Sequence, residues 1–153
     1  MTSNLQLPYN IVQTDNLTYM FITQSGVVYT AYFIDISHSF GSDSVYTFSF
    51  DAAGKTVKDD RVRVTILKIL NDFFQSVRNA LLVVCDSSDN REKSRFKLFR
   101  KGYEAIIEPE IEKVDVSIDL GGCVIYSSLL LSKRHPQADE MKDLFYEWVN
   151  MGG

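Results

Sequence analysis

The chain has 153 residues, which is enough for one globular domain to bury its own core without metals or disulfides. Hydrophobic residues make up 45% and charged residues 24% of the chain, which excludes an intrinsically disordered protein. The net charge of −4 excludes a protein that coats nucleic acid with its whole surface. We therefore expect a single globular domain over residues 1–153.

The first half of the chain predicts an antiparallel sheet followed by a helix. β-branched and aromatic residues dominate four segments that short turn signals separate, at 9–14, 17–23, 27–36 and 45–50. Apolar residues then recur at helical spacing from Val62 to Val77, and Asp59 or Asp60 could cap this helix. We expect the helix to pack across the sheet.

The second half of the chain predicts three more strands and two more helices. The segment 81–85 is apolar throughout, which is typical of a strand buried on both faces in the middle of a sheet. A basic helix is expected from residue 90 to about 103, paired strands at 114–120 and 123–132, and a last helix with Pro136 at its first position. The expected fold is α+β, with a mostly antiparallel sheet in the order β-β-β-β-α-β-α-β-β-α and helices packed on it.

Two isolated cysteines, Cys85 and Cys123, form no Cys-x-x-Cys pair, so no disulfide framework or zinc ribbon is expected. The N-terminal residues lack a secretion signal, and no apolar run is long enough to span a membrane. These features predict a cytoplasmic protein with no membrane partner.

The strongest charge feature lies between residues 91 and 101. This stretch holds six bases and one acid, a local charge of +5, so the rest of the chain carries −9. Arg91 and Arg95 are four residues apart and would share one helix face, where both could reach a phosphate or carboxylate. An acidic and polar loop precedes them at the end of the buried strand. The predicted binding residues are Asp86, Ser87, Asp89, Arg91, Arg95, Lys97 and Lys101.

Three interpretations of this segment stay open. In a purely structural one, Asp89 or Asn90 caps the helix and Asp86 pairs with an arginine. In a binding module, the basic helix contacts an acidic protein or a nucleic-acid backbone. In a metal-dependent nuclease or other phosphoryl-transfer enzyme, Asp86 and Asp89 hold a divalent ion and the arginines stabilise charge. The last needs a third acid, for which the chain offers Glu108, Glu110, Asp115 and Asp119.

Other catalytic signals are weak, so the sequence favours a protein that is not an enzyme and has no cofactor or resident metal. The two histidines, His38 in a loop and His135 before a proline, stand alone and are typical of surface or capping residues. Cys85 lies in an apolar strand, where a thiol acts as a small hydrophobic group. No Gly-x-Ser-x-Gly motif indicates a serine hydrolase.

Two parts of the chain resemble a known type of family. They are the run Asp-Ser-Ser-Asp-Asn-Arg at 86–91 with Arg95, Phe96, Leu98 and Phe99, and the run Tyr-Ser-Ser-Leu-Leu-Leu at 126–131 with His135 and Pro136. The chain is similar to a small uncharacterised bacterial domain family of unknown function. The resemblance implies a short stand-alone bacterial protein and supplies no catalytic residues. Oligomeric state and partner identity are left open by the sequence.

Overall fold

A computed structural model describes residues 7–86, 110–119, 121, 122 and 124–150 of the chain. The side chains of Cys85 and Asp86 are not part of this description. The chain divides into two compact units. Unit 1 comprises Met1–Ile34 with Phe48–Phe73, and unit 2 comprises Asp35–Thr47 with Phe74–Gly153. That residues 1–153 form one domain stays a prediction.

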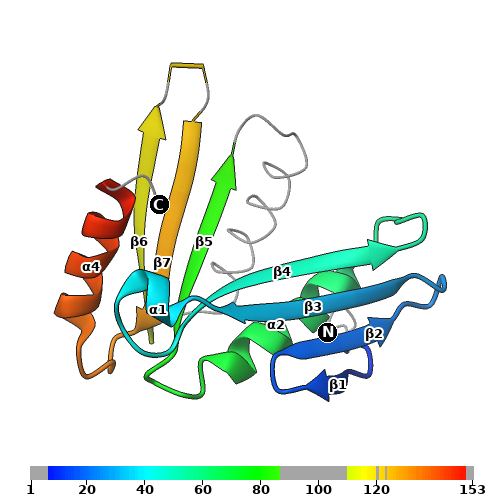
Figure 1. Cartoon of the computed structure of the whole chain (residues 1–153). Helices are drawn as coiled ribbons and strands as arrows, with labels where there is room; N and C mark the ends of the chain where they lie inside the picture. Colours follow the sequence, from blue (N-terminus) through cyan, green and yellow to red (C-terminus); the bar gives the residue numbers. More distant parts are fainter. Residues whose placement is uncertain (1–6, 87–109, 120, 123, 151–153) are drawn as a thin grey trace, which may run out of the picture. The chain divides into compact units, whose positions relative to one another are not determined.

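Seven strands follow one another by hydrogen bonding in the order β1-β2-β3-β4-β5-β7-β6 (Figure 1). The sheet is mostly antiparallel, as the sequence predicts, with one parallel pair between β4 (Val45–Ala53) and β5 (Ala80–Asp86). The exception follows from the chain order, because α2 (Asp60–Phe73) connects these two strands and returns the chain to the end where β4 began. The α+β class is therefore confirmed, and a layer of helices on the sheet stays a prediction.

Unit 1 begins with the predicted meander. Its first three strands are β1 (Val12–Asp15), β2 (Thr18–Ile22) and β3 (Val28–Asp35). The last residue of β3, Asp35, is assigned to unit 2. The β1–β2 turn closes where the Asp15 carboxylate accepts a hydrogen bond from the Leu17 backbone N–H, at 2.8 Å. The β2–β3 turn places Gly26 at a φ of 87°, a conformation that favours glycine.

A stack of aromatic rings fills unit 1 and reaches α2. The Tyr9 ring stacks on Phe21, and Phe21 stacks on Tyr29 with ring centroids 5.1 Å apart. Further along β3, the Phe33 ring stacks on Phe73 of α2 at 4.4 Å. Asp59 caps α2 as expected, because its carboxylate accepts from the Arg61 backbone N–H at 3.0 Å.

Unit 2 is built around β5, β6 (Ile111–Asp119) and β7 (Val124–Ser132), with α4 (Ala138–Asn150) alongside β6 (Figure 1). β5 lies between β4 and β7, as its apolar sequence predicts. Leu81 and Leu82 point to opposite faces of the sheet and are 0% and 1% exposed, so β5 is buried on both sides here. One core cluster joins strand residues to one face of α4; its fully buried members include Leu82, Leu129, Leu131, Met141 and Phe145.

Two expectations for unit 2 are wrong in detail. A short helix, α1 (Ser37–Phe40), occupies part of the stretch predicted as a loop and contains His38. It ends at Gly41, whose φ of 93° and N–H bond to the Ser37 carbonyl close the turn. The last helix begins at Ala138, because the His135 imidazole accepts the Gln137 N–H and holds Pro136 in a separate turn. The predicted helix at 90–103 lies outside the described residues.

Candidate functional site

The predicted site begins where β5 ends. Asp86 is the last residue of β5, and its backbone pairs with Ile125 of β7. The position expected for Asp86, at the carboxyl end of a central strand, is confirmed, and its side chain is outside the description. The remaining predicted binding residues lie outside the described residues altogether, and their role stays a prediction: Ser87, Asp89, Arg91, Arg95, Lys97 and Lys101.

The described strands fix where the chain leaves β5 and where it enters β6. The chain leaves β5 beside Ile125 and enters β6 at Ile111, which pairs with Ser132 at the other end of β7. These two positions on β7 are about 24 Å apart at the rise of an extended strand. β5 and β6 are both antiparallel to β7 and so run in the same direction. Residues 87–110 therefore connect opposite ends of the sheet in this unit.

The acids proposed as a third metal ligand already have partners within unit 2. Asp115 accepts from the Ser128 hydroxyl at 2.5 Å and pairs with the Lys113 ammonium at 3.0 Å. Asp119 accepts from the Gly121 backbone N–H, and Glu110 lies 3.6 Å from Arg134. Glu108 is outside the described residues.

The pairing register adds a second argument against a shared metal site. Asp86 pairs with Ile125, and Ile125 pairs with Ile118 of β6. The β6 residue in line with Asp86 is therefore apolar, and it lies two strand spacings away, about 10 Å. Within the described ranges, no group of three or more His, Cys, Asp or Glu residues could hold a metal ion.

A polar cluster on one face of the β6–β7 pair was missed by the sequence analysis. Ser128 is 1% exposed, and its hydroxyl donates to Asp115, the residue directly opposite on β6. Lys113 flanks the same carboxylate, and a hollow of about 290 Å³ beside the cluster is bordered by Tyr126 and Ser117. Burial of the Ser128 hydroxyl keeps it from acting as a nucleophile, so the cluster can bind a polar group but has no evident catalytic use.

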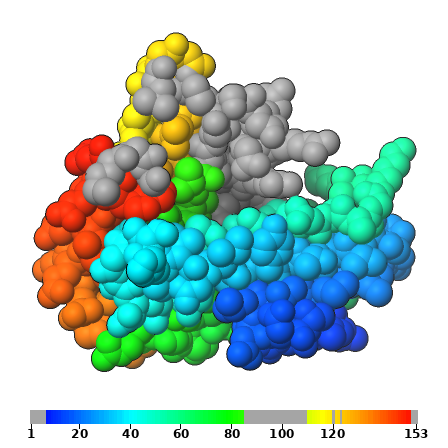
Figure 2. All heavy atoms as spheres, viewed as in Figure 1, coloured from blue at the N-terminus to red at the C-terminus, as the bar shows by residue number. Residues whose placement is uncertain are grey.

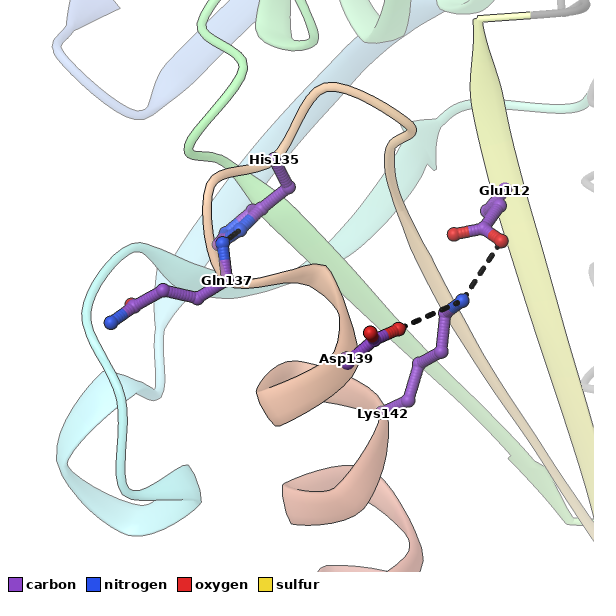
Figure 3. A network of polar contacts seen from close by, with 5 residues as sticks. All are labelled: Glu112, His135, Gln137, Asp139 and Lys142. Atoms are coloured by element: carbon purple, nitrogen blue, oxygen red, sulfur yellow. Dashed lines mark hydrogen bonds and ion pairs between the residues drawn. The ribbon is translucent and has the colours of Figure 1, made fainter.

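A second polar network fastens the start of α4 to β6 (Figure 3). The Lys142 ammonium lies 2.9 Å from Glu112 of β6 and 4.0 Å from Asp139, one turn earlier in α4. The hydrogen bond to Glu112 raises the pKa of Lys142 above its usual value, with burial acting against it and the nearby acids adding to it. The lysine is therefore charged at neutral pH and its positive charge is matched by two acids.

His135 is a buried connector beside this network and not a surface residue. Its side chain is 8% exposed, and its Nδ1 accepts from the Gln137 N–H at 3.0 Å (Figure 3). Burial lowers the pKa of His135; a hydrogen bond with the Arg78 backbone raises it, and the Arg78 charge lowers it. The lowered pKa favours the neutral imidazole, which holds the turn before α4 and does not cap the helix itself, because Gln137 precedes Ala138. His38, on α1, is exposed.

Comparison with known proteins gives a family without an assigned activity. Residues 58–147 match the model of a family of unknown function, DUF6169. The chain belongs to this family. The expectation of an uncharacterised domain family is confirmed, and the bacterial origin stays a prediction. No curated protein and no solved structure matches the chain.

The DUF6169 match covers α2, β5, β6, β7 and all but the end of α4, and it includes the whole basic segment 91–101. It leaves β1 to β4 outside. None of the described helices is long and apolar enough to cross a membrane. The Lys113–Asp115–Ser128 cluster lies inside the matched region, and its only sequence signal was the alternation of polar residues along β6.

Proposed function

We propose that the chain is a non-enzymatic binding or regulatory module that contacts an anionic or acidic partner through residues 91–101. The observation that supports this is the separation of charge, +5 in that segment against −9 in the rest of the chain. Such a contrast attracts a polyanion to one place on an otherwise acidic molecule. The proposal places the protein in the cytoplasm of a bacterial cell, which agrees with a sequence that holds only two isolated cysteines.

Well-paired strands precede and follow the predicted contact segment in the chain. β5 pairs with β7 over its whole length, and β6 pairs with β7 over all nine of its residues. Two well-paired strands therefore border residues 87–110, the part of the chain that contains the proposed contact segment.

Fluorescence anisotropy with defined anionic probes tests the proposal. The probes are a poly-glutamate peptide, a single-stranded oligonucleotide and a duplex, each titrated at several salt concentrations. We expect one of these classes to bind wild type with an affinity that falls as salt rises, since binding releases counterions. Changing Arg91 and Arg95 together to Glu should abolish this binding without lowering the melting temperature.

A matched control separates local charge from total charge. Lys55 and Lys58 are exposed residues outside the segment, and changing both to Glu alters the net charge by the same amount. This control variant should keep most of the affinity if residues 91–101 are the contact surface. Equal loss in both variants would contradict the proposal, because binding would then follow net charge alone.

The alternative is a metal-dependent nuclease or other phosphoryl-transfer enzyme that uses the Asp86/Asp89 loop. In its favour, Asp86 ends a central strand whose first three residues pair in parallel with β4, and sites of α/β proteins commonly lie at the carboxyl ends of parallel strands. A divalent ion bound by the native state must raise its stability by mass action. An unchanged melting temperature in millimolar Mg²⁺ or Mn²⁺ would exclude this alternative.

A further inference from the structure

The two edges of the sheet are built differently. β1, at one edge, has four residues, and its register with β2 shifts between Gln13 and Asp15. A short strand with a bulge is a usual way to prevent pairing with another chain. β6, at the other edge, has nine residues in unbroken register with β7. Within the described part of the chain, no strand pairs with the outer side of β6.

The backbone groups on the outer side of β6 can be assigned. The Glu110 carbonyl accepts from the Lys133 N–H, so Glu110 directs its backbone groups toward the β7 side. Backbone direction alternates along an antiparallel strand, and every second residue after Glu110 therefore also faces β7. The residues between them direct their N–H and C=O groups outward, away from β7. Three of these outward residues are exposed: Asp115, Ser117 and Asp119.

We propose that two copies of this chain pair through their β6 strands, antiparallel about a two-fold axis at Val116. In this register Asp115 lies opposite Ser117 of the second copy, and both are residues with outward backbone groups, as a hydrogen-bonded pair requires. The hydroxyl of Ser117 can donate to the Asp115 carboxylate across the axis. The Asp115–Ser117 pair and its symmetry mate each contribute two backbone hydrogen bonds, four in all.

The side chains on both faces of β6 are self-complementary in this register. On the polar face Lys113 lies opposite Asp119 of the second copy, which gives two opposite-charge pairs. On the other face Val114 lies opposite Ile118 of the second copy, and Val116 meets its own copy; all three are partly buried members of the core edge. Cross-strand charge pairs and β-branched pairs both stabilise a sheet. Centring the axis on Asp115 would instead place the two Asp115 carboxylates together.

The neighbouring helix supplies further apolar surface for the second copy. The Lys142 side chain binds Glu112 of β6. Tyr146 lies four residues after Lys142 in α4, so the side chains of Lys142 and Tyr146 are on the face of α4 that turns toward β6. Tyr146 is 47% exposed, and in Figure 2 α4 and the end of the β6–β7 hairpin lie on the surface of this unit. The contact area is at the small end for stable dimers, so we expect a dissociation constant on the order of 10 µM.

Sedimentation equilibrium between about 5 and 500 µM, a range that brackets this affinity, tests the proposal. Wild type should change from monomer to dimer. Ser117→Pro removes an outward N–H and leaves the bonds to β7 intact, so it should yield monomer with little change in melting temperature. The control Ser117→Ala keeps the N–H and should still dimerise. A wild-type monomer throughout the range would overturn the proposal.

Charge reversal tests the register itself. Lys113→Glu places two acids opposite each other in its own dimer, and Asp119→Lys places two lysines together, so each variant alone should raise the dissociation constant about tenfold. Mixing the two variants restores both opposite-charge pairs, and the mixture should form heterodimers. Absence of heterodimers, with both variants folded and wild type dimeric, would overturn this register.

Discussion

Asp59 has two functions in unit 1, and a double-mutant cycle can separate them. Its carboxylate caps α2 through the Arg61 N–H and also accepts from the Tyr9 hydroxyl at 2.5 Å. Tyr9 itself is 8% exposed, and its hydroxyl oxygen accepts from the Gln24 N–H at 3.2 Å. Tyr9→Phe therefore removes one bond to a charged group and leaves a backbone donor without its partner.

The expected magnitudes follow from these contacts. Loss of a hydrogen bond to a charged group costs about 1.5–3 kcal/mol of unfolding free energy, and loss of a helix cap costs about 1 kcal/mol. Asp59→Ala should thus destabilise by about 2.5–4 kcal/mol, and Tyr9→Phe by about 1.5–3 kcal/mol. The double variant loses the tyrosine bond once and the helix cap once. Its loss of unfolding free energy should therefore be smaller than the sum of the two single effects by about the free energy of the tyrosine bond.

Urea unfolding followed by circular dichroism measures all four members of the cycle. A matched control is Tyr32→Phe, the same chemical change at a partly exposed tyrosine whose bond to Asp51 is long, at 3.4 Å, and we expect it to cost less than about 0.5 kcal/mol. Additive effects of Tyr9→Phe and Asp59→Ala, or equal effects of the two tyrosine variants, would refute the assignment of a shared bond.

Three further predictions concern unit 2. The lowered pKa of His135 means that the native state resists protonation of this imidazole. The stability that the neutral imidazole contributes is therefore complete above pH 6.5 and decreases as the pH falls below 6.5. The melting temperatures at pH 7.5 and 5.5 should differ more for wild type than for His135→Gln. Leu129→Ala, at a fully buried core position, should lower the unfolding free energy in urea by about 2–5 kcal/mol. Gly41→Ala should cost about 1 kcal/mol in the same assay because the φ of 93° is strained for alanine, whereas Ser42→Ala beside it should cost much less.

The elements that sequence periodicity could predict are the ones with a long, one-sided or all-apolar pattern. β5 was placed in the middle of the sheet because its residues are apolar on both faces, and the structure pairs it on both sides. α1 was missed because its four residues, Ser-His-Ser-Phe, are too few to show a helical period. Its boundaries depend instead on Gly41 and on burial of Phe40, which only the fold reveals.

The candidate sites differ in the same way. A charge run such as 91–101 can be read directly from the sequence. The contact between Asp115 and Ser128 cannot, because these residues meet only through the register of β6 against β7, and a shift of one residue would separate them. Register likewise shows that Ile118, and not an acid, lies in line with Asp86.

The two proposals depend on different residues and can fail independently, but together they have one consequence. A two-fold dimer would carry two copies of the basic segment, so a long polyanion could engage both, and the second contact would form at a high effective concentration. Ser117→Pro should then weaken binding to a long probe by tenfold or more while leaving binding to a short probe unchanged. Equal loss with both probes would mean that the substitution disturbs the segment itself, and no loss with either would mean that each copy binds its partner alone.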